Sequence, residues 1–166
     1  MKIEDIDLEN IKVVIFDFDN TLAIHEDKEF ANYRRKSEEK YRNYYLNAYK
    51  NPNTFYENIE KCIKSETLYN FITNLRNKSI KMYCLSGMKF SFHLKAKQSF
   101  INKHYGNDIE VISTASQELK FDGVKIIQQL NNCRLEEILF IDDNKNVIEL
   151  LSNSGINAIL VENIEV

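Results

Sequence analysis

The chain has 166 residues, 43% of them hydrophobic, which is enough for one well-packed domain with a small insertion. A formal net charge of -3 excludes a general nucleic-acid binder, whose domain would be strongly basic. The three cysteines are odd in number and form no C-x-x-C pair, so no disulfide framework is expected. The acidic start MKIEDIDLEN, and the lack of any run near ~20 apolar residues, predict a soluble, cytoplasmic protein that does not bind membranes.

Short apolar runs recur along the chain at the length of β-strands. The first, KVVIFDF at residues 12–18, is rich in β-branched and aromatic residues. These runs are continuous and mostly do not alternate with polar residues, which is typical of strands buried on both faces of a parallel sheet. Four more runs have this character: 80–86, 109–113, 137–142 and 157–161.

Helical patterns lie between the strand candidates. Residues 66–77 place Leu68, Phe71, Ile72 and Leu75 on one apolar stripe of a helix. The alternation of strand and helix predicts an α/β fold, a Rossmann-like three-layer sandwich around a five-stranded parallel sheet. An antiparallel edge is left open only for the first and last strands. Similar helical stripes occupy 89–104, 122–131 and 145–154.

One segment interrupts this alternation. Residues 24–64 contain no strand candidate, and their pattern predicts two helices at 27–49 and 54–63. We expect a helical cap inserted into a core formed by residues 1–23 and 65–166. The stretch 33–50 holds six Lys or Arg, two Glu and five Tyr. The simpler interpretation is a solvated amphipathic helix, and the alternative is a surface that admits anionic or aromatic substrates.

Polar residues follow the strand candidates at the points where the strands end. In an open parallel sheet these ends meet at one edge, where ligands bind. The edge is therefore expected to collect four carboxylates, a hydroxyl group and an ammonium group. The residues at this edge are Asp17, Asp19, Thr21, Ser86, Gly87, Lys120, Asp142 and Asp143.

Four carboxylates in one place require a cation, because like charges raise one another's pKa or repel. Oxygen ligands of this kind suit Mg²⁺, and a lysine with a hydroxyl donor complements a phosphoryl group. Each residue alone also has an ordinary structural explanation. Asp143 could cap the next helix, Ser86 could sit in a turn, and Lys120 could be a solvated charge. Their joint order along one edge is what these separate explanations do not account for.

That order resembles the haloacid dehalogenase (HAD) superfamily of phosphatases and phosphotransferases over nearly the whole chain. The stretch DFDNTL resembles the family's first motif, and YCLSG resembles the second. Lys120 resembles the third motif, and FIDDNKNVIELLSNSG resembles the fourth. The resemblance implies a sheet order of 5-4-1-2-3, numbering the strands along the chain, and a cap after the first strand.

The resemblance also implies roles for the first motif. Asp17 would be the nucleophile that forms an aspartyl-phosphate, and its carboxylate would bind Mg²⁺. Asp19 would be the general acid and then the general base, with its main-chain carbonyl on the metal. Thr21 would steady the turn. Because a halide leaving group needs no proton, Asp19 favours a phosphate ester or anhydride over a dehalogenase substrate.

The other motifs would bind substrate and metal. Ser86 with Gly87 would contact the phosphoryl oxygens, and Lys120 would neutralise charge there. Lys125 competes for the third motif, but its position inside the predicted helix favours Lys120.

In the family's fourth motif the direct metal ligand lies 12 residues before the helix-ending glycine, so counting back from Gly155 the resemblance implies Asp143. Asp142 would be its companion, acting through water or by holding Lys120. His25, His93 and His104 show no ligand spacing and are assigned surface or packing roles.

These residues predict a Mg²⁺-dependent phosphatase that hydrolyses a small phosphomonoester through an aspartyl-phosphate. A phosphomutase or phosphotransferase of the same superfamily is the nearest alternative. A non-catalytic binding module that retains the fold is disfavoured, because it would be expected to lose Asp17, Asp19 or the acidic pair. A phospho-receiver domain would carry its acidic pair after the first strand, which this chain does not.

Overall fold

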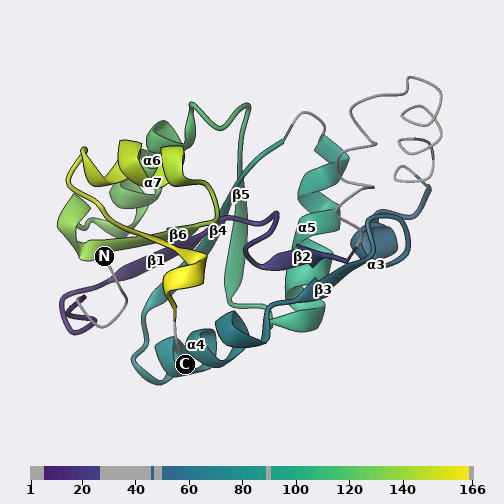
Figure 1. The fold of residues 1–166 in the computed structure, drawn as a ribbon, viewed down its shortest axis with the longest axis horizontal. Coiled ribbons are helices and arrows are strands. Elements are labelled where there is room, and N and C mark those ends of the chain that lie inside the picture. Colours follow the sequence, from purple (N-terminus) through teal and green to yellow (C-terminus); the bar gives the residue numbers. More distant parts are fainter. Residues whose placement is uncertain (1–5, 27–45, 47–49, 89–90, 165–166) are drawn as a thin grey trace.

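A computed structural model describes residues 6–26, 46, 50–88 and 91–164 of the chain (Figure 1). Its centre is a five-stranded sheet in the order β5-β4-β1-β6-β7, in which every neighbouring pair is parallel. Read from β7, this is the predicted order 5-4-1-2-3, so the predicted fold class is confirmed and neither edge strand is antiparallel. The strands are β1 (Val13–Phe16), β4 (Lys81–Gly87), β5 (Ile109–Thr114), β6 (Ile138–Asp142) and β7 (Asn157–Leu160).

The central strand β1 explains why its sequence is apolar without alternation. All four of its residues are buried, and it pairs with β4 on one side and β6 on the other. Val14 and Phe16 belong to the apolar cluster on one face of the sheet, whereas Val13 and Ile15 belong to the cluster on the other. A strand buried on both faces needs apolar residues at every position.

Helices cover both faces of the sheet (Figure 1). The cluster on one face includes buried residues of α4 and α5, and the cluster on the other includes those of α6 and α7. No helix among the described residues is long and apolar enough to cross a membrane. The helices are α4 (Glu66–Asn77), α5 (Ser91–His104), α6 (Lys120–Asn131) and α7 (Lys145–Ser152), with short 3-10 turns η3 (Leu135–Glu137) and η4 (Val161–Asn163).

A glycine lets α6 lie close to the sheet. A Cβ atom at Gly123 would come within 2.7 Å of Leu85 Cδ1 and 2.9 Å of Thr114 Cγ2. Real Cβ atoms essentially never show such distances, so any larger residue here would require the side chains of Leu85 and Thr114 to shift. The close packing sets the position of Lys120, the first residue of the same helix.

The segment between β1 and α4 begins and ends in a second, small sheet. Strands β2 (Ala23–His25) and β3 (Cys62–Lys64) pair antiparallel, and η2 (Pro52–Thr54) and α3 (Phe55–Asn58) precede β3. The prediction of no strand in 24–64 is therefore wrong, and the helix predicted over 54–63 is confirmed only at Phe55–Asn58. Strands of three residues carry no readable periodicity, and Lys61 has a φ of +48°, which an α-helix cannot accommodate. The helix predicted at 27–49 falls almost wholly outside the described residues.

The side chain of Tyr105 ties together the two chain segments that flank this small sheet. Its hydroxyl donates to the carbonyl of Leu22, which precedes β2, at 2.6 Å. The same hydroxyl accepts from the amide of Ser65, which follows β3, at 2.7 Å. Tyr105 and Leu22 are buried and Ser65 is half-buried, so loss of the hydroxyl leaves the Leu22 carbonyl without access to water.

We expect Tyr105→Phe to lower the free energy of unfolding by about 1–3 kcal/mol, because it leaves the buried Leu22 carbonyl and the Ser65 amide without their hydrogen-bond partner. Urea denaturation of the variant and the wild type measures this loss. The matched control is Tyr69→Phe, which removes a hydroxyl from a ring that is 37% exposed. Equal stability of the two variants would contradict this account of Tyr105.

Candidate active site

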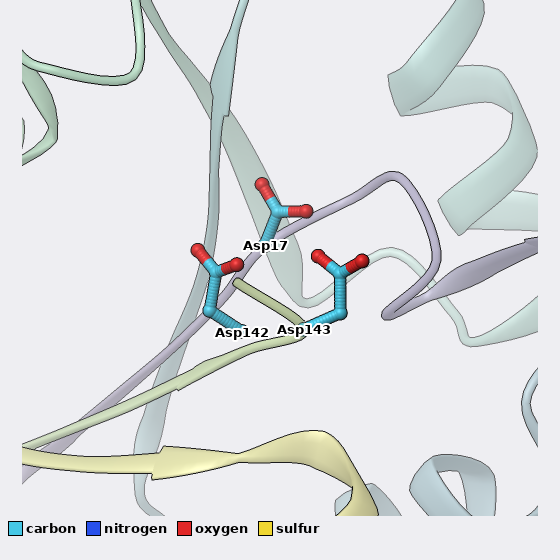
Figure 2. A group of neighbouring side chains, drawn as sticks. All are labelled: Asp17, Asp142 and Asp143. Carbon is cyan, nitrogen blue, oxygen red and sulfur yellow. The ribbon is translucent and has the colours of Figure 1, made fainter. Parts of the chain in front are cut away.

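Three carboxylates meet where the central strands end. Asp17 directly follows β1, Asp142 is the last residue of β6, and Asp143 follows it. Figure 2 shows their carboxylate groups turned toward one space, and one ligand atom from each lies within 4.8 Å of the others. Asp17 and Asp142 are buried, whereas Asp143 is exposed. The amide of Asp17 donates to the carbonyl of Ile141 at 2.8 Å, which holds the end of β1 against β6.

Lys120 places its ammonium group between two of these carboxylates. Its Nζ lies 2.7 Å from Asp17 Oδ1 and 2.5 Å from Asp142 Oδ2, and the lysine is fully buried. The other oxygen of Asp142 accepts from the amide of Asn144 at 2.8 Å. Lys125, the competing candidate, is exposed and lies over the ring of Phe121. Of the two lysines, it is Lys120 that contacts the acidic cluster.

The buried charged groups shift one another's pKa. Burial raises the pKa of Asp17 to about 6, since loss of water and the neighbouring carboxylates outweigh the favourable charge of Lys120. Burial also raises the pKa of Asp142, and partial desolvation and the Asp17 charge raise the pKa of Asp143. Burial alone would lower the pKa of Lys120, but the charges of Asp17 and Asp142 raise it. The amine therefore stays charged.

The chemistry of this donor set fits a hard divalent cation. One ammonium group faces three carboxylates, so the cluster carries excess negative charge when all three are ionised. The donors are all carboxylate oxygens, the ligands that Mg²⁺ prefers, and a cation between them would lower the cost of ionising each.

Asp19 lies beside this cluster with a different set of partners. Lys97 Nζ lies 2.7 Å from its Oδ2, and His25 Nε2 lies 3.1 Å from its Oδ1. Its side chain is 34% exposed. Desolvation opposes ionisation, but the charge of Lys97 and the hydrogen bonds from His25 and Lys97 hold the pKa of Asp19 well below its ordinary value. Asp19 is thus an ionised carboxylate in this structure.

His25 is buried and belongs to a cluster formed by the small sheet. Its Nδ1 lies 3.4 Å from Cys62 Sγ and 3.3 Å from Glu60 Oε2. Desolvation would lower the pKa of His25, but its hydrogen bonds to Asp19, Cys62 and Glu60 raise it to about 11. The ring is therefore an imidazolium that donates toward Asp19. A surface or packing role does not describe this histidine.

The second motif contributes the hydroxyl group of Ser86 and, at Gly87, a position where another loop packs closely against the backbone. Ser86 is buried, and its Oγ lies 2.7 Å from Lys97 Nζ. A Cβ atom at Gly87 would lie 3.5 Å from the carbonyl carbon of Ser116 and 3.6 Å from the amide nitrogen of Gln117. The loop that leads to α6 therefore runs directly against the end of β4.

Thr21 lies in the tight turn after β1. Its amide donates to the carbonyl of Phe18 at 3.3 Å, and Asn20 beside it takes a left-handed φ of +58°. Thr21 is fully buried, and its hydroxyl has no hydrogen-bond partner in the described part of the chain. The turn accounts for its backbone, but the structure offers no partner that explains the hydroxyl.

Lys97 is the site residue that the sequence analysis missed. It is buried on α5 and contacts both Asp19 and Ser86. The signal was a lysine one turn before Phe100 and Ile101, on the apolar face of a helix where a solvated lysine would not be expected.

No protein-family model and no curated protein matches the sequence. Solved structures match most of the chain. A phosphoserine phosphatase solved as a phospho-aspartyl intermediate analogue is 16% identical, with a TM-score of 0.56 over 89% of this chain and 84% of that one. A HAD-like family hydrolase from Porphyromonas gingivalis is 17% identical, with a TM-score of 0.59 over 90% of both chains. A HAD family enzyme from Bacteroides thetaiotaomicron, in complex with magnesium and inorganic phosphate, is 16% identical, with a TM-score of 0.55 over 90% of this chain and 93% of that one.

The chain therefore has the α/β fold of HAD-like hydrolases, with a Rossmann-type core. Its structural neighbours across most of its length are HAD family enzymes, among them a phosphoserine phosphatase. The resemblance inferred from the four motifs is confirmed at the level of the fold.

Asp17 is expected to destabilise the metal-free protein. Its folded pKa of about 6 lies above the ordinary 3.8, so its ionisation costs folding free energy, fully so above pH 6. We expect Asp17→Asn, which is neutral and still accepts from Lys120, to raise the free energy of unfolding on the order of 1–3 kcal/mol above that pH. The gain should shrink as the pH falls through 6.

Urea denaturation in EDTA, on either side of the Asp17 pKa, measures this difference. The control is Glu149→Gln, which makes the same change of charge at an exposed position of α7. A lower stability of Asp17→Asn than of the wild type above that pH would contradict the expectation.

Proposed function

We propose that the protein is a Mg²⁺-dependent phosphatase that hydrolyses a phosphomonoester through an aspartyl-phosphate on Asp17. The observation that carries the proposal is the cluster of Asp17, Asp142 and Asp143, in which the ammonium group of Lys120 contacts the first two carboxylates. The fold is that of HAD-like hydrolases, and one structural neighbour holds magnesium and inorganic phosphate. A buried carboxylate beside a fixed positive charge suits nucleophilic attack on phosphorus.

Each acidic residue of the cluster has a role in the proposed reaction. The carboxylates of Asp17 and Asp143, with the main-chain carbonyl of Asp19, would hold Mg²⁺, and Asp142 would be their companion. When bound, the ion would neutralise charge on the phosphoryl oxygens and on the carboxylates. Asp142 meanwhile holds Lys120 at 2.5 Å, which keeps the ammonium group 2.7 Å from the nucleophile.

Asp19 would act on both halves of the reaction. Its low pKa suits the second half, in which an ionised carboxylate removes a proton from the water that attacks the aspartyl-phosphate. In the first half it would have to donate a proton to the departing oxygen. An arriving phosphoryl group adds negative charge nearby and raises the pKa of Asp19, which favours uptake of that proton.

Ser86, Gly87 and Lys120 would surround the transferred phosphoryl group. Ser86 would donate a hydroxyl proton to an oxygen of this group, and the backbone at Gly87 would let it approach closely. Lys120 would balance the charge that the phosphoryl group brings to Asp17. Thr21 would support the turn that carries Asp19. The substrate class that fits is a small phosphorylated compound.

The purified protein is expected to hydrolyse an aryl phosphate such as p-nitrophenyl phosphate only with Mg²⁺ present, because the acidic cluster carries excess negative charge without a cation. Released phosphate is measured with Mg²⁺, with excess EDTA, and after Mg²⁺ is restored. Turnover that persists unchanged in EDTA would remove the metal from the proposal.

Asp17→Asn should abolish turnover, because the amide keeps the shape of the carboxylate but is a poor nucleophile. Asp19→Asn should slow it by ~10²–10⁴-fold, the usual contribution of general acid–base catalysis. Initial rates with Mg²⁺ measure both losses, and circular dichroism checks that each variant is folded. Glu149→Gln is the control and should retain the wild-type rate. More than a few per cent of the wild-type rate in Asp17→Asn would be incompatible with an aspartyl-phosphate.

A further inference from the structure

Lys97 carries a buried positive charge that the four motifs do not account for. The residue is 3% exposed, and it lies on helix α5 rather than at the end of a central strand. Its Nζ lies 2.7 Å from Asp19 Oδ2 and 2.7 Å from Ser86 Oγ. The same nitrogen lies 4.5 Å from the centre of the Phe18 ring. The ammonium group is thus directed at two polar atoms of the site and at the face of an aromatic ring.

Burying a charge in this position costs folding free energy. An ammonium group removed from water loses hydration that its partners only partly replace, and an apolar side chain of similar size often gives equal or better stability. Leu or Met on this face of α5 would pack among the neighbouring buried residues Ala96, Phe100 and Ile101 without that cost. Stability alone therefore gives little reason for a lysine here.

The contact with Ser86 fixes the direction of its hydroxyl proton. A lysine ammonium group has donors and no acceptor, so Ser86 Oγ must accept the bond from Lys97. The hydroxyl proton of Ser86 then points elsewhere and stays available to an incoming phosphoryl oxygen.

The contact with Asp19 completes a two-sided hold on its carboxylate. Lys97 binds Oδ2 from α5, and His25 binds Oδ1 from β2. With each oxygen bonded to a different element, the carboxylate has one defined rotation about its side-chain bond.

We propose that Lys97 is a positioning residue, which orients the carboxylate of Asp19 toward the leaving group and the hydroxyl of Ser86 toward the phosphoryl group. The inference rests on the proposed phosphatase function and extends it. Lys97 acts through Asp19 during proton transfer and through Ser86 during phosphate binding. A displacement of about 1 Å in such a group can lower the reaction rate by a large factor.

The test compares Lys97→Met with Lys95→Met, its exposed neighbour on the same helix. Values of kcat/KM are measured with Mg²⁺ for an aryl phosphate and for an alkyl phosphate. The alkyl leaving group needs the proton from Asp19 more than the aryl group does. We expect Lys97→Met to lower kcat/KM by ~10–100-fold for the alkyl phosphate and by only a few-fold for the aryl phosphate. It should also weaken inhibition by inorganic phosphate, and Lys95→Met should change none of these values.

A double-mutant cycle separates positioning from a structural role. In the Asp19→Asn background, Lys97→Met should lower kcat/KM for the alkyl phosphate only by the few-fold loss that it causes with the aryl phosphate, because Ser86 is then the only group left for it to position. Equal losses on both substrates, additive with Asp19→Asn, would overturn the role of Lys97. If Lys97→Met is not folded by circular dichroism, Lys97→Gln enters the same comparisons and the same two outcomes decide. A wild-type protein inactive on both phosphates would instead overturn the proposed function, and this inference with it.

Discussion

The ammonium group of Lys120 between Asp17 and Asp142 is the contact on which the rest of the site depends. It joins the end of β1 to the end of β6 from a third element, α6, so three parts of the chain must be in place at once. Gly123 allows α6 to pack close to the sheet, which places Lys120 beside these carboxylates. Without this charge, two buried carboxylates would face each other with no neutralising partner among these groups.

Much of the fold could be predicted from the sequence because its signals are local. The apolar run of β1 reflects its burial on both faces. The buried face of α4 is likewise visible as an apolar stripe, formed by Leu68, Phe71, Ile72 and Leu75. Strand order then follows from the family resemblance, and the meeting of Asp17 with Asp142 follows from the parallel sheet. Lys120 could be chosen over Lys125 because one lies where its helix starts and the other lies inside it.

The parts that could not be predicted depend on contacts between distant segments. Lys97 reaches Asp19 only because α5 packs beside the turn after β1, and nothing in either stretch encodes that meeting. His25 acquires its role from pairing with the strand that holds Cys62, and strands of three residues leave no pattern to read. In both cases a polar side chain serves a site that lies far away in the sequence.

The place of β1 in the middle of the sheet has a consequence for how the chain reaches its native state. This strand is synthesised before its partners, because Val13 pairs with Lys81 on one side and with Ile138 on the other. Its backbone partners therefore emerge from the ribosome late, and contacts between such distant residues form slowly. Until then the segment Val13–Phe16 is an unpaired apolar strand, the kind of species that aggregates during synthesis. The strand that leads to Asp17 is thus also one that needs protection on a nascent chain.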